Sequence, residues 1–215
     1  MREILQGFYN KSHFTKRLIM VILAVIVMGF SLSLLLLVDM GTDPCTMMNK
    51  AISSKLGLSI GNWQAIFNIL LLMVVIIFGG RNLGFGTLAN MFLVGYSIDF
   101  FTMLWGKVLP LEWFDILWIK VAVFIPALII FVLAAAIYMD VDLGTSPYDA
   151  VPYIISERMS SIPFKIIRIL YDFTTIGIGM VLGGRLEIVT ILMALLLGPT
   201  IGMVGKKLDK MLNKE

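Results

Sequence analysis

The sequence predicts an all-α integral membrane protein whose six transmembrane helices form two inverted three-helix repeats. Composition, the length of the apolar runs and a repeated motif lead to this prediction. Of the 215 residues, 59% are hydrophobic and 14% are charged, whereas an ordinary soluble domain carries about 25% charged residues. A soluble fold could not bury so much apolar surface, so lipid is the expected solvent for most of the chain.

Six apolar runs have the length that a membrane-spanning helix needs. A helix requires about 20 predominantly apolar residues to cross a hydrocarbon core of about 30 Å. The first run resembles a signal sequence, but its apolar part is too long and no small-residue cleavage site follows, so we expect an uncleaved first span. The runs cover residues 18–40, 62–79, 87–106, 116–139, 163–182 and 187–205.

A repeated motif indicates that the two halves are duplicated. VDMGTDP at 38–44 recurs as VDLGTSP at 141–147, with five of seven positions identical at an offset of 103. A unit with three crossings ends on the opposite side of the membrane, so its copy must enter inverted. Inverted repeats are a common plan of secondary transporters, with the substrate site between the halves. An ancient duplication kept only for packing is the alternative.

The charge pattern predicts the topology. Lys and Arg number 12 on the side of the two termini and 5 on the other side, so the positive-inside rule places both termini in the cytoplasm. We expect a cytoplasmic N-terminal tail at 1–16, repeats at 17–110 and 111–205, and a basic cytoplasmic C-terminal tail at 206–215.

Each half carries a short polar segment after its first span. Asp43 is a good N-cap and Pro44 suits the first helical position, and Ser146 and Pro147 repeat this pattern. We therefore expect a short helix in each half, either re-entrant or interfacial. A re-entrant helix would present free N–H groups to an anionic substrate group, whereas an interfacial helix would lie along the membrane surface. The candidate binding residues of these segments are Gly41, Thr42, Asp43, Pro44, Gly144, Thr145, Ser146, Pro147 and Asp149. The two glycines are also explained as C-caps of the preceding spans.

Polar residues within the spans are further candidates for substrate binding or ion coupling. A charge in hydrocarbon costs about 2.5–3.5 kcal/mol on insertion scales, so Asp99 and Asp172 are functional candidates, either of which could carry a coupling proton. Asp172 aligns with Asn68 of the first half. Arg168 lies four residues before Asp172, so a purely structural ion pair is an equal alternative. Asn68 and Asn90 could line a cavity or form hydrogen bonds between helices.

Several classes of function are not expected. The chain has one cysteine, Cys45, and one histidine, His13, too few for a disulfide or a conventional zinc site. The basic residues lie at the ends of apolar runs, which indicates topology rather than nucleic-acid binding. Neither a Walker lysine nor a nucleophile–base pair is visible, so we expect no cofactor and no enzymatic activity.

Two segments carry recognisable motifs, namely GTDPCTMMNKAISSKLGLSIGNWQ at 41–64 and GFGTLANMFLVGYSIDF at 84–100. They resemble the bacterial YczE/YyaS/YitT group of small membrane proteins, and the YczE type most closely. The resemblance covers essentially the whole chain and leaves no room for the soluble C-terminal domain of YitT-type relatives. It implies a bacterial cytoplasmic-membrane protein, and some members of the group have been associated with antibiotic production or export. The residues that match the group's two motifs are Gly41, Pro44, Gly57, Leu58, Ser59 and Gly61 in the first and Gly84, Gly86, Thr87, Asn90, Gly95, Ile98 and Asp99 in the second.

These observations predict a secondary transporter or exporter of an unknown small organic molecule that alternates access about the repeat interface. A substrate-binding membrane subunit of an energy-coupling-factor uptake system is the main alternative, and it would need an ATPase partner. An accessory membrane protein without transport activity is a third possibility. The lipid bilayer is the expected partner, and the oligomeric state is open, a homo-oligomer included.

Overall fold

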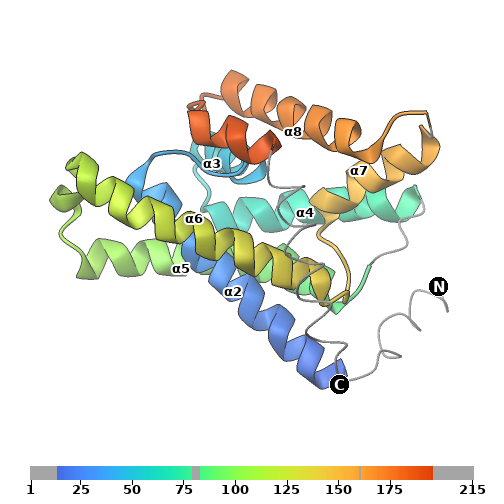
Figure 1. The fold of residues 1–215 in the computed structure, drawn as a ribbon, viewed down its shortest axis with the longest axis horizontal. Coiled ribbons are helices and arrows are strands. Elements are labelled where there is room, and N and C mark those ends of the chain that lie inside the picture. Colours follow the sequence, from blue (N-terminus) through green and yellow to red (C-terminus); the bar gives the residue numbers. More distant parts are fainter. Residues whose placement is uncertain (1–13, 79–82, 160, 196–215) are drawn as a thin grey trace.

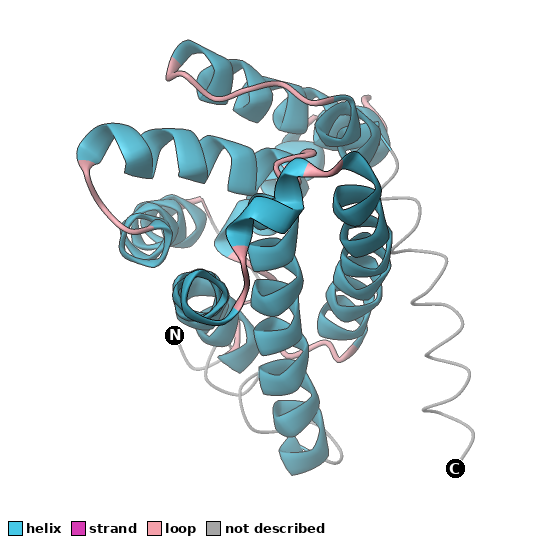
Figure 2. Ribbon diagram, turned by 90° about the vertical axis from the view of Figure 1, so that its left-hand side faces the viewer, coloured by secondary structure: helices cyan, strands magenta, loops and turns pink. Residues whose placement is uncertain are grey.

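The computed structural model describes residues 14–78, 83–159 and 161–195, and all the regular structure in these ranges is helical (Figures 1 and 2). A last helical segment covers residues 188–195. The helices are α2 (Phe14–Val38), α3 (Pro44–Leu56), α4 (Ile60–Ile77), α5 (Phe85–Val108), the short 3₁₀ helix η1 (Leu111–Asp115), α6 (Leu117–Asp140), α7 (Pro147–Arg158) and α8 (Phe164–Val181).

Four described helices, α2, α4, α5 and α6, are long and apolar enough to cross a membrane. This confirms the predicted class of α-helical membrane protein. The fifth predicted span forms α8, but Lys165, Arg168 and Asp172 make it more polar than these four. The sixth predicted span is described only as far as residue 195, and the predicted tails at 1–16 and 206–215 lie largely outside the described residues.

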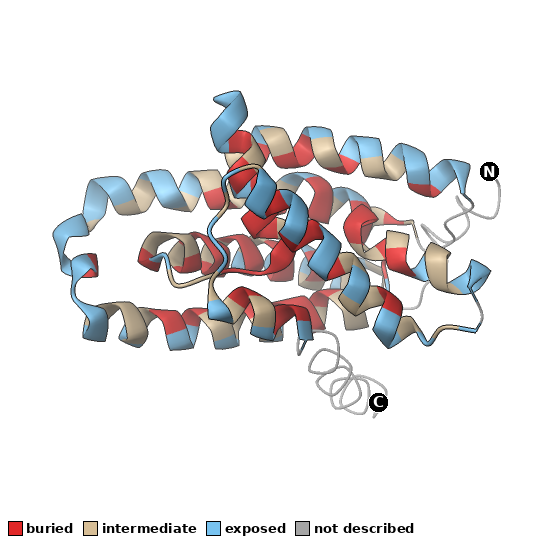
Figure 3. Cartoon of the chain, turned by 90° about the horizontal axis from the view of Figure 1, so that it is seen from above, coloured by how far each residue is buried: buried red, intermediate tan, exposed pale blue. Residues whose placement is uncertain are grey.

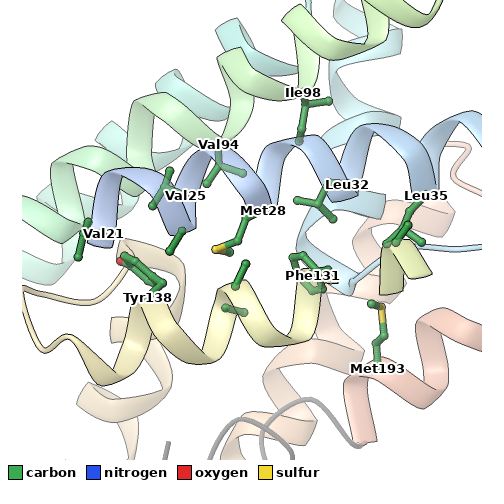
Figure 4. Close-up of a cluster of buried hydrophobic side chains, with 14 of the residues drawn as sticks. Val21, Val25, Met28, Leu32, Leu35, Val94, Ile98, Phe131, Tyr138 and Met193 are labelled. Carbon is green, nitrogen blue, oxygen red and sulfur yellow. The ribbon is translucent and has the colours of Figure 1, made fainter. Parts of the chain in front are cut away.

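The main apolar core surrounds α2, which packs between α5 and α6 (Figure 4). Val25 and Leu35 of α2 are fully buried, because this helix is apolar on every side and has neighbours on two of them. Gly29 allows the close approach of α5, since a Cβ atom at this position would lie 2.4 Å from Ser97 Cβ. The core thus holds α2 in place along its length.

The outside of the bundle is rich in exposed apolar side chains, whereas buried positions gather in its middle (Figure 3). Ile77, Trp118 and Val181 are 75%, 80% and 82% exposed. Large apolar surfaces of this kind are rare on soluble monomers and mark contacts with membranes or other proteins. Lipid-facing side chains explain the pattern.

Each of the two short helices packs against a helix from the other half of the chain, so the halves exchange these packing partners. α3 packs against α8, and α7 packs against α4 (Figure 1). Each short helix also contacts the helix that directly follows it in sequence. The first residues of both short helices, Pro44 and Pro147, are buried by this packing.

The two copies of the motif share one backbone conformation. Asp39 and Asp142 have φ values of 51° and 54°, and Gly41 and Gly144 have φ values of 114° and 107°. The left-handed residue that follows each span is therefore the aspartate, and the explanation of the glycines as C-caps is wrong. The glycines permit close packing instead, because a Cβ atom on Gly144 would lie 2.5 Å from Gly84 N.

Candidate functional site

A cavity of about 540 Å³ lies where the two short helices meet the bundle. Its walls come from α2, α4, α5, α6 and α8 and from the N-terminal ends of α3 and α7. Pockets of about 300–1,000 Å³ with a few convergent polar groups are typical of small-molecule sites. The cavity is therefore the leading candidate for a binding site.

The N-terminus of α3 contributes Asp43 to the cavity wall. The Asp43 carboxylate caps the helix, since Oδ1 accepts a hydrogen bond of 3.1 Å from Thr46 N, and Pro44 occupies the first turn as predicted. Asp43 is only 8% exposed. Its second oxygen, Oδ2, has no hydrogen-bond partner among the described residues. This buried oxygen is free to bind a ligand.

The N-terminus of α7 is capped in the same way, which also confirms the predicted pattern. Ser146 Oγ accepts a hydrogen bond of 3.0 Å from Asp149 N and donates one of 2.7 Å to Asp149 Oδ2. Pro147 occupies the first turn. In both short helices a side chain of the motif therefore already binds one of the N–H groups that an anionic ligand would use.

Arg168 of α8 joins two carboxylates at the side of the cavity. Its Nη1 contacts Asp149 Oδ1 at 2.5 Å, and its Nε contacts Asp172 Oδ2 at 3.1 Å. Tyr148 OH donates a hydrogen bond of 2.7 Å to Asp172 Oδ1. The pair of Arg168 with Asp172 is thus confirmed, and it extends to α7 through Asp149.

Uncharged polar groups complete the wall on the side of the first half. Gln64 and Asn68 from α4 and Asn90 from α5 line the cavity. Asn68 Nδ2 donates a long hydrogen bond of 3.4 Å to Met91 O. The cavity therefore contains six of the predicted site residues: Asp43, Asn68, Asn90, Ser146, Asp149 and Arg168.

Asp172 does not line the cavity, but it contacts Arg168, which does. The remaining predicted residues lie elsewhere. Asp99 lines neither described cavity, and its Oδ2 accepts a hydrogen bond of 2.9 Å from Gly61 N at the start of α4. Thr145 O accepts a hydrogen bond of 2.7 Å from Thr87 Oγ1, which fixes the second motif to α5. Gly41 and Thr42 line a second cavity of about 460 Å³.

The second cavity holds an ion pair of the first motif. Lys50 Nζ contacts Asp39 Oδ1 at 3.0 Å, and Arg185 Nη1 lies 3.8 Å from Asp39 Oδ2. The hydrogen bond from Lys50 lowers the pKa of the Asp39 carboxyl group, and the nearby positive charges lower it further. These residues join the end of α2 to α3.

The sequence did not single out several residues of the first cavity. Gln64 and Tyr148 became candidates only when long-range packing placed them on the wall. Asp140, which also lines this cavity, could have been predicted as a candidate from the sequence, because it is a carboxylate at the end of an apolar run and directly precedes the repeated motif.

The fold and the cavity define a multi-helix membrane protein with a largely apolar cavity that several polar side chains line. The chain belongs to the family described as "Family of unknown function (DUF6198)", which matches residues 15–206. It is similar to "Uncharacterized protein YyaS" of Bacillus subtilis (strain 168), with 24% identity over 135 residues, which is 63% of this chain and 66% of that protein. The match thus spans slightly less than two thirds of the relative. No solved structure matches the chain.

Proposed function

We propose that this protein is a secondary transporter of a small organic molecule and that the first cavity is its substrate site. The observation that carries this proposal is that the N-terminal ends of α3 and α7, one from each copy of the motif, line the same cavity. Substrate sites between inverted repeats, formed in part by interrupted helices, are a common plan of secondary transporters. The cavity would open to alternate sides as the halves move.

We further propose six spans in two inverted repeats, with α3 and α7 as re-entrant helices. The exchanged contacts of α3 with α8 and of α7 with α4 support this arrangement, because they relate the two halves in the same way in both directions. The burial of Pro44, Thr46 and Pro147 supports re-entry, because an interfacial helix would expose its start to water and headgroups.

The ion pairs of Arg168 are the proposed coupling element. Arg168 links Asp149 of α7 to Asp172 of α8, so protonation of either carboxylate would weaken a contact between two helices of the second half. Asp99 is less suited to this role, because its carboxylate caps α4 away from the cavity. The proposal also retains the closer likeness to the YczE type and a role in export of a small compound.

Purified protein in liposomes tests the proposed function. A panel of small amines, carboxylates, vitamins and antibiotics is first screened for thermal stabilisation, because a ligand that binds only the folded state raises its stability. We expect at least one stabilising compound to show flux that depends on an imposed pH gradient. A compound that binds without flux, together with co-purifying ATPase subunits, would favour the uptake-system alternative. Neither binding nor flux across the panel would contradict transport.

The proposed orientation in the cytoplasmic membrane is tested with reporter fusions. Three spans precede Pro110, so alkaline phosphatase fused after this residue is expected outside the cytoplasm and active. A phosphatase fused after the C-terminal residue, Glu215, is expected to be inactive. The reverse pattern would show that both termini lie outside.

A further inference from the structure

We infer that the first cavity selects an organic cation, such as an ammonium or guanidinium compound. This inference rests on the proposed function and names its substrate class. Of the described residues that line the cavity, three are aspartates, namely Asp43, Asp140 and Asp149, whereas Arg168 is the one basic residue. Among the described residues of the wall, carboxyl side chains therefore outnumber basic ones.

The positive charge of Arg168 is already compensated. Two carboxylates, those of Asp149 and Asp172, lie at 2.5 Å and 3.1 Å from its guanidinium nitrogens. An anionic ligand would have to compete with both of them. Since both carboxylates already contact the guanidinium group, Arg168 does not make the site attractive to anions.

Asp43 is the best-placed contact for a cationic ligand. Its Oδ1 is used by Thr46 N, but its Oδ2 has no hydrogen-bond partner among the described residues, although the residue is more than nine-tenths buried. A buried carboxylate oxygen without a partner is energetically costly. An N–H group or ammonium group of a ligand in the cavity would donate a hydrogen bond to this oxygen, and an ammonium group would also place a positive charge beside the carboxylate.

The aromatic residues of the wall favour the same class of ligand. Tyr138, Tyr148, Tyr153, Phe131 and Phe164 line the cavity, and aromatic faces attract ammonium and guanidinium groups, the more so when water is excluded. Arg168 makes such a cation–π contact within the protein, since its guanidinium carbon lies 5.3 Å from the centroid of the Tyr148 ring. Carboxylates and aromatic rings together make a wall suited to an organic cation of moderate size.

The sequence had suggested an anionic group at the helix N-termini. That expectation depended on unoccupied N–H groups. The side chains of Asp43 and Ser146 bind N–H groups at both ends, and Asp43 adds a carboxyl group of its own. The same motif that suggested an anion site therefore supplies a carboxylate for a cation.

A matched set of ligands tests the charge preference. Phenethylammonium, phenethyl alcohol and phenylacetate have similar size and differ in charge, and their affinities for the detergent-solubilised full-length protein can be measured by calorimetry at about pH 7. We expect the cation to bind about tenfold or more tightly than the other two. Equal affinities, tighter binding of phenylacetate, or no binding of the cation up to millimolar concentration would overturn the inference.

Two variants locate the effect. Asp43→Asn keeps a good N-cap for α3 but removes the charge, and we expect it to weaken cation binding about tenfold. Asp115→Asn removes an exposed carboxylate outside the cavity and serves as the matched control. Loss of affinity in both variants, or in neither, would contradict a specific contact with Asp43.

A second measurement does not depend on the size of the ligand. Cys45 is the chain's one cysteine and lines the cavity, so it can be modified by methanethiosulfonates carrying either a trimethylammonium or a sulfonate group. We expect the ratio of the two rates, normalised to a small free thiol, to favour the cationic reagent, and Asp43→Asn to reduce it. A ratio no greater than that of the free thiol, or no reaction with either reagent, would overturn the inference.

The outcomes separate this inference from the proposed function. If the protein transports an anion and does not prefer cations, the proposed charge preference is wrong but the proposed transport function is supported. Selective binding of the cation without flux in liposomes would leave the site standing and contradict transport.

Discussion

Thr87 joins two distant parts of the chain through one hydroxyl group. Its Oγ1 accepts a hydrogen bond of 3.0 Å from Gly84 N and donates one of 2.7 Å to Thr145 O, and the residue is 2% exposed. The start of α5 and the second motif are therefore held together by a buried side chain.

We expect Thr87→Val to destabilise the protein by about 1–3 kcal/mol, because it leaves the buried N–H group of Gly84 and the partly buried carbonyl group of Thr145 without this partner. Thr87→Ser retains the hydroxyl group and should lose much less stability. Thermal unfolding in detergent measures both variants. Equal unfolding temperatures for Thr87→Val and the unchanged protein would show that these hydrogen bonds do not stabilise the contact between α5 and the second motif.

Asp39 offers a test of a single charge. Its pKa is lowered from the usual 3.8 chiefly by the hydrogen bond from Lys50, so the ion pair stabilises the folded state above about pH 3.8, and this contribution is lost as the pH falls through the lowered pKa. Asp39→Asn removes the charge but tolerates the left-handed backbone at this position.

We expect Asp39→Asn to unfold at a lower temperature than the unchanged protein at about pH 7, by an amount equivalent to less than about 1 kcal/mol because the pair is half exposed. The difference should shrink as the pH is lowered below 3.8. A difference that stays constant across this range would mean that the effect of the substitution is not electrostatic.

At the residue scale, contacts between residues close in sequence could be predicted, whereas contacts between distant residues could not. The caps at Asp43 and Ser146 follow from neighbouring residues, and so does the pair of Arg168 with Asp172 four residues later. The contact of Asp99 with Gly61 depends on how α5 packs against α4. A sequence pattern does not contain that information.

At the scale of elements, α4 and α5 are held at short distance by glycines. A Cβ atom on Gly95 would lie 2.8 Å from Gly61 Cα, which is a backbone atom that cannot move away by rotation of a side chain. Small residues allow close helix packing in membrane bundles, and Asp99 strengthens the same contact from α5.

We expect Gly95→Val to force these helices apart and to destabilise the protein by about 1–3 kcal/mol, as overpacking does in other cores. Gly106→Ala in the same helix is the control, because a Cβ atom there meets nothing within 4 Å. Thermal unfolding of both variants checks the prediction. A loss of stability in Gly106→Ala as large as that in Gly95→Val would point to a general effect of glycine replacement.

The long apolar helices could be predicted because a membrane imposes one length and one composition on its spans. The short helices could be predicted from their caps, and α8 covers 164–181 where the fifth span was expected at 163–182. The exchange of α3 and α7 between the halves could not be predicted. It depends on packing between segments about 100 residues apart, and the composition of the cavity follows from it.

At the scale of the whole molecule, the proposed function requires that ligands bind in the first cavity. One residue from each copy of the motif lines a cavity in which several polar side chains meet inside an apolar bundle. The capping residue of each copy, Asp43 in the first and Ser146 in the second, lies in the wall of this cavity.

Protection of Cys45 tests this claim most directly, because the thiol lies in the cavity wall and is the chain's one cysteine. The measurement is the rate at which a small neutral maleimide modifies the purified protein, with and without a saturating ligand identified by thermal stabilisation. We expect the ligand to slow modification about tenfold or more, because it occupies the space that the reagent must enter. A ligand that stabilises the protein but leaves the rate unchanged would show that it binds elsewhere and would contradict the assignment of the cavity.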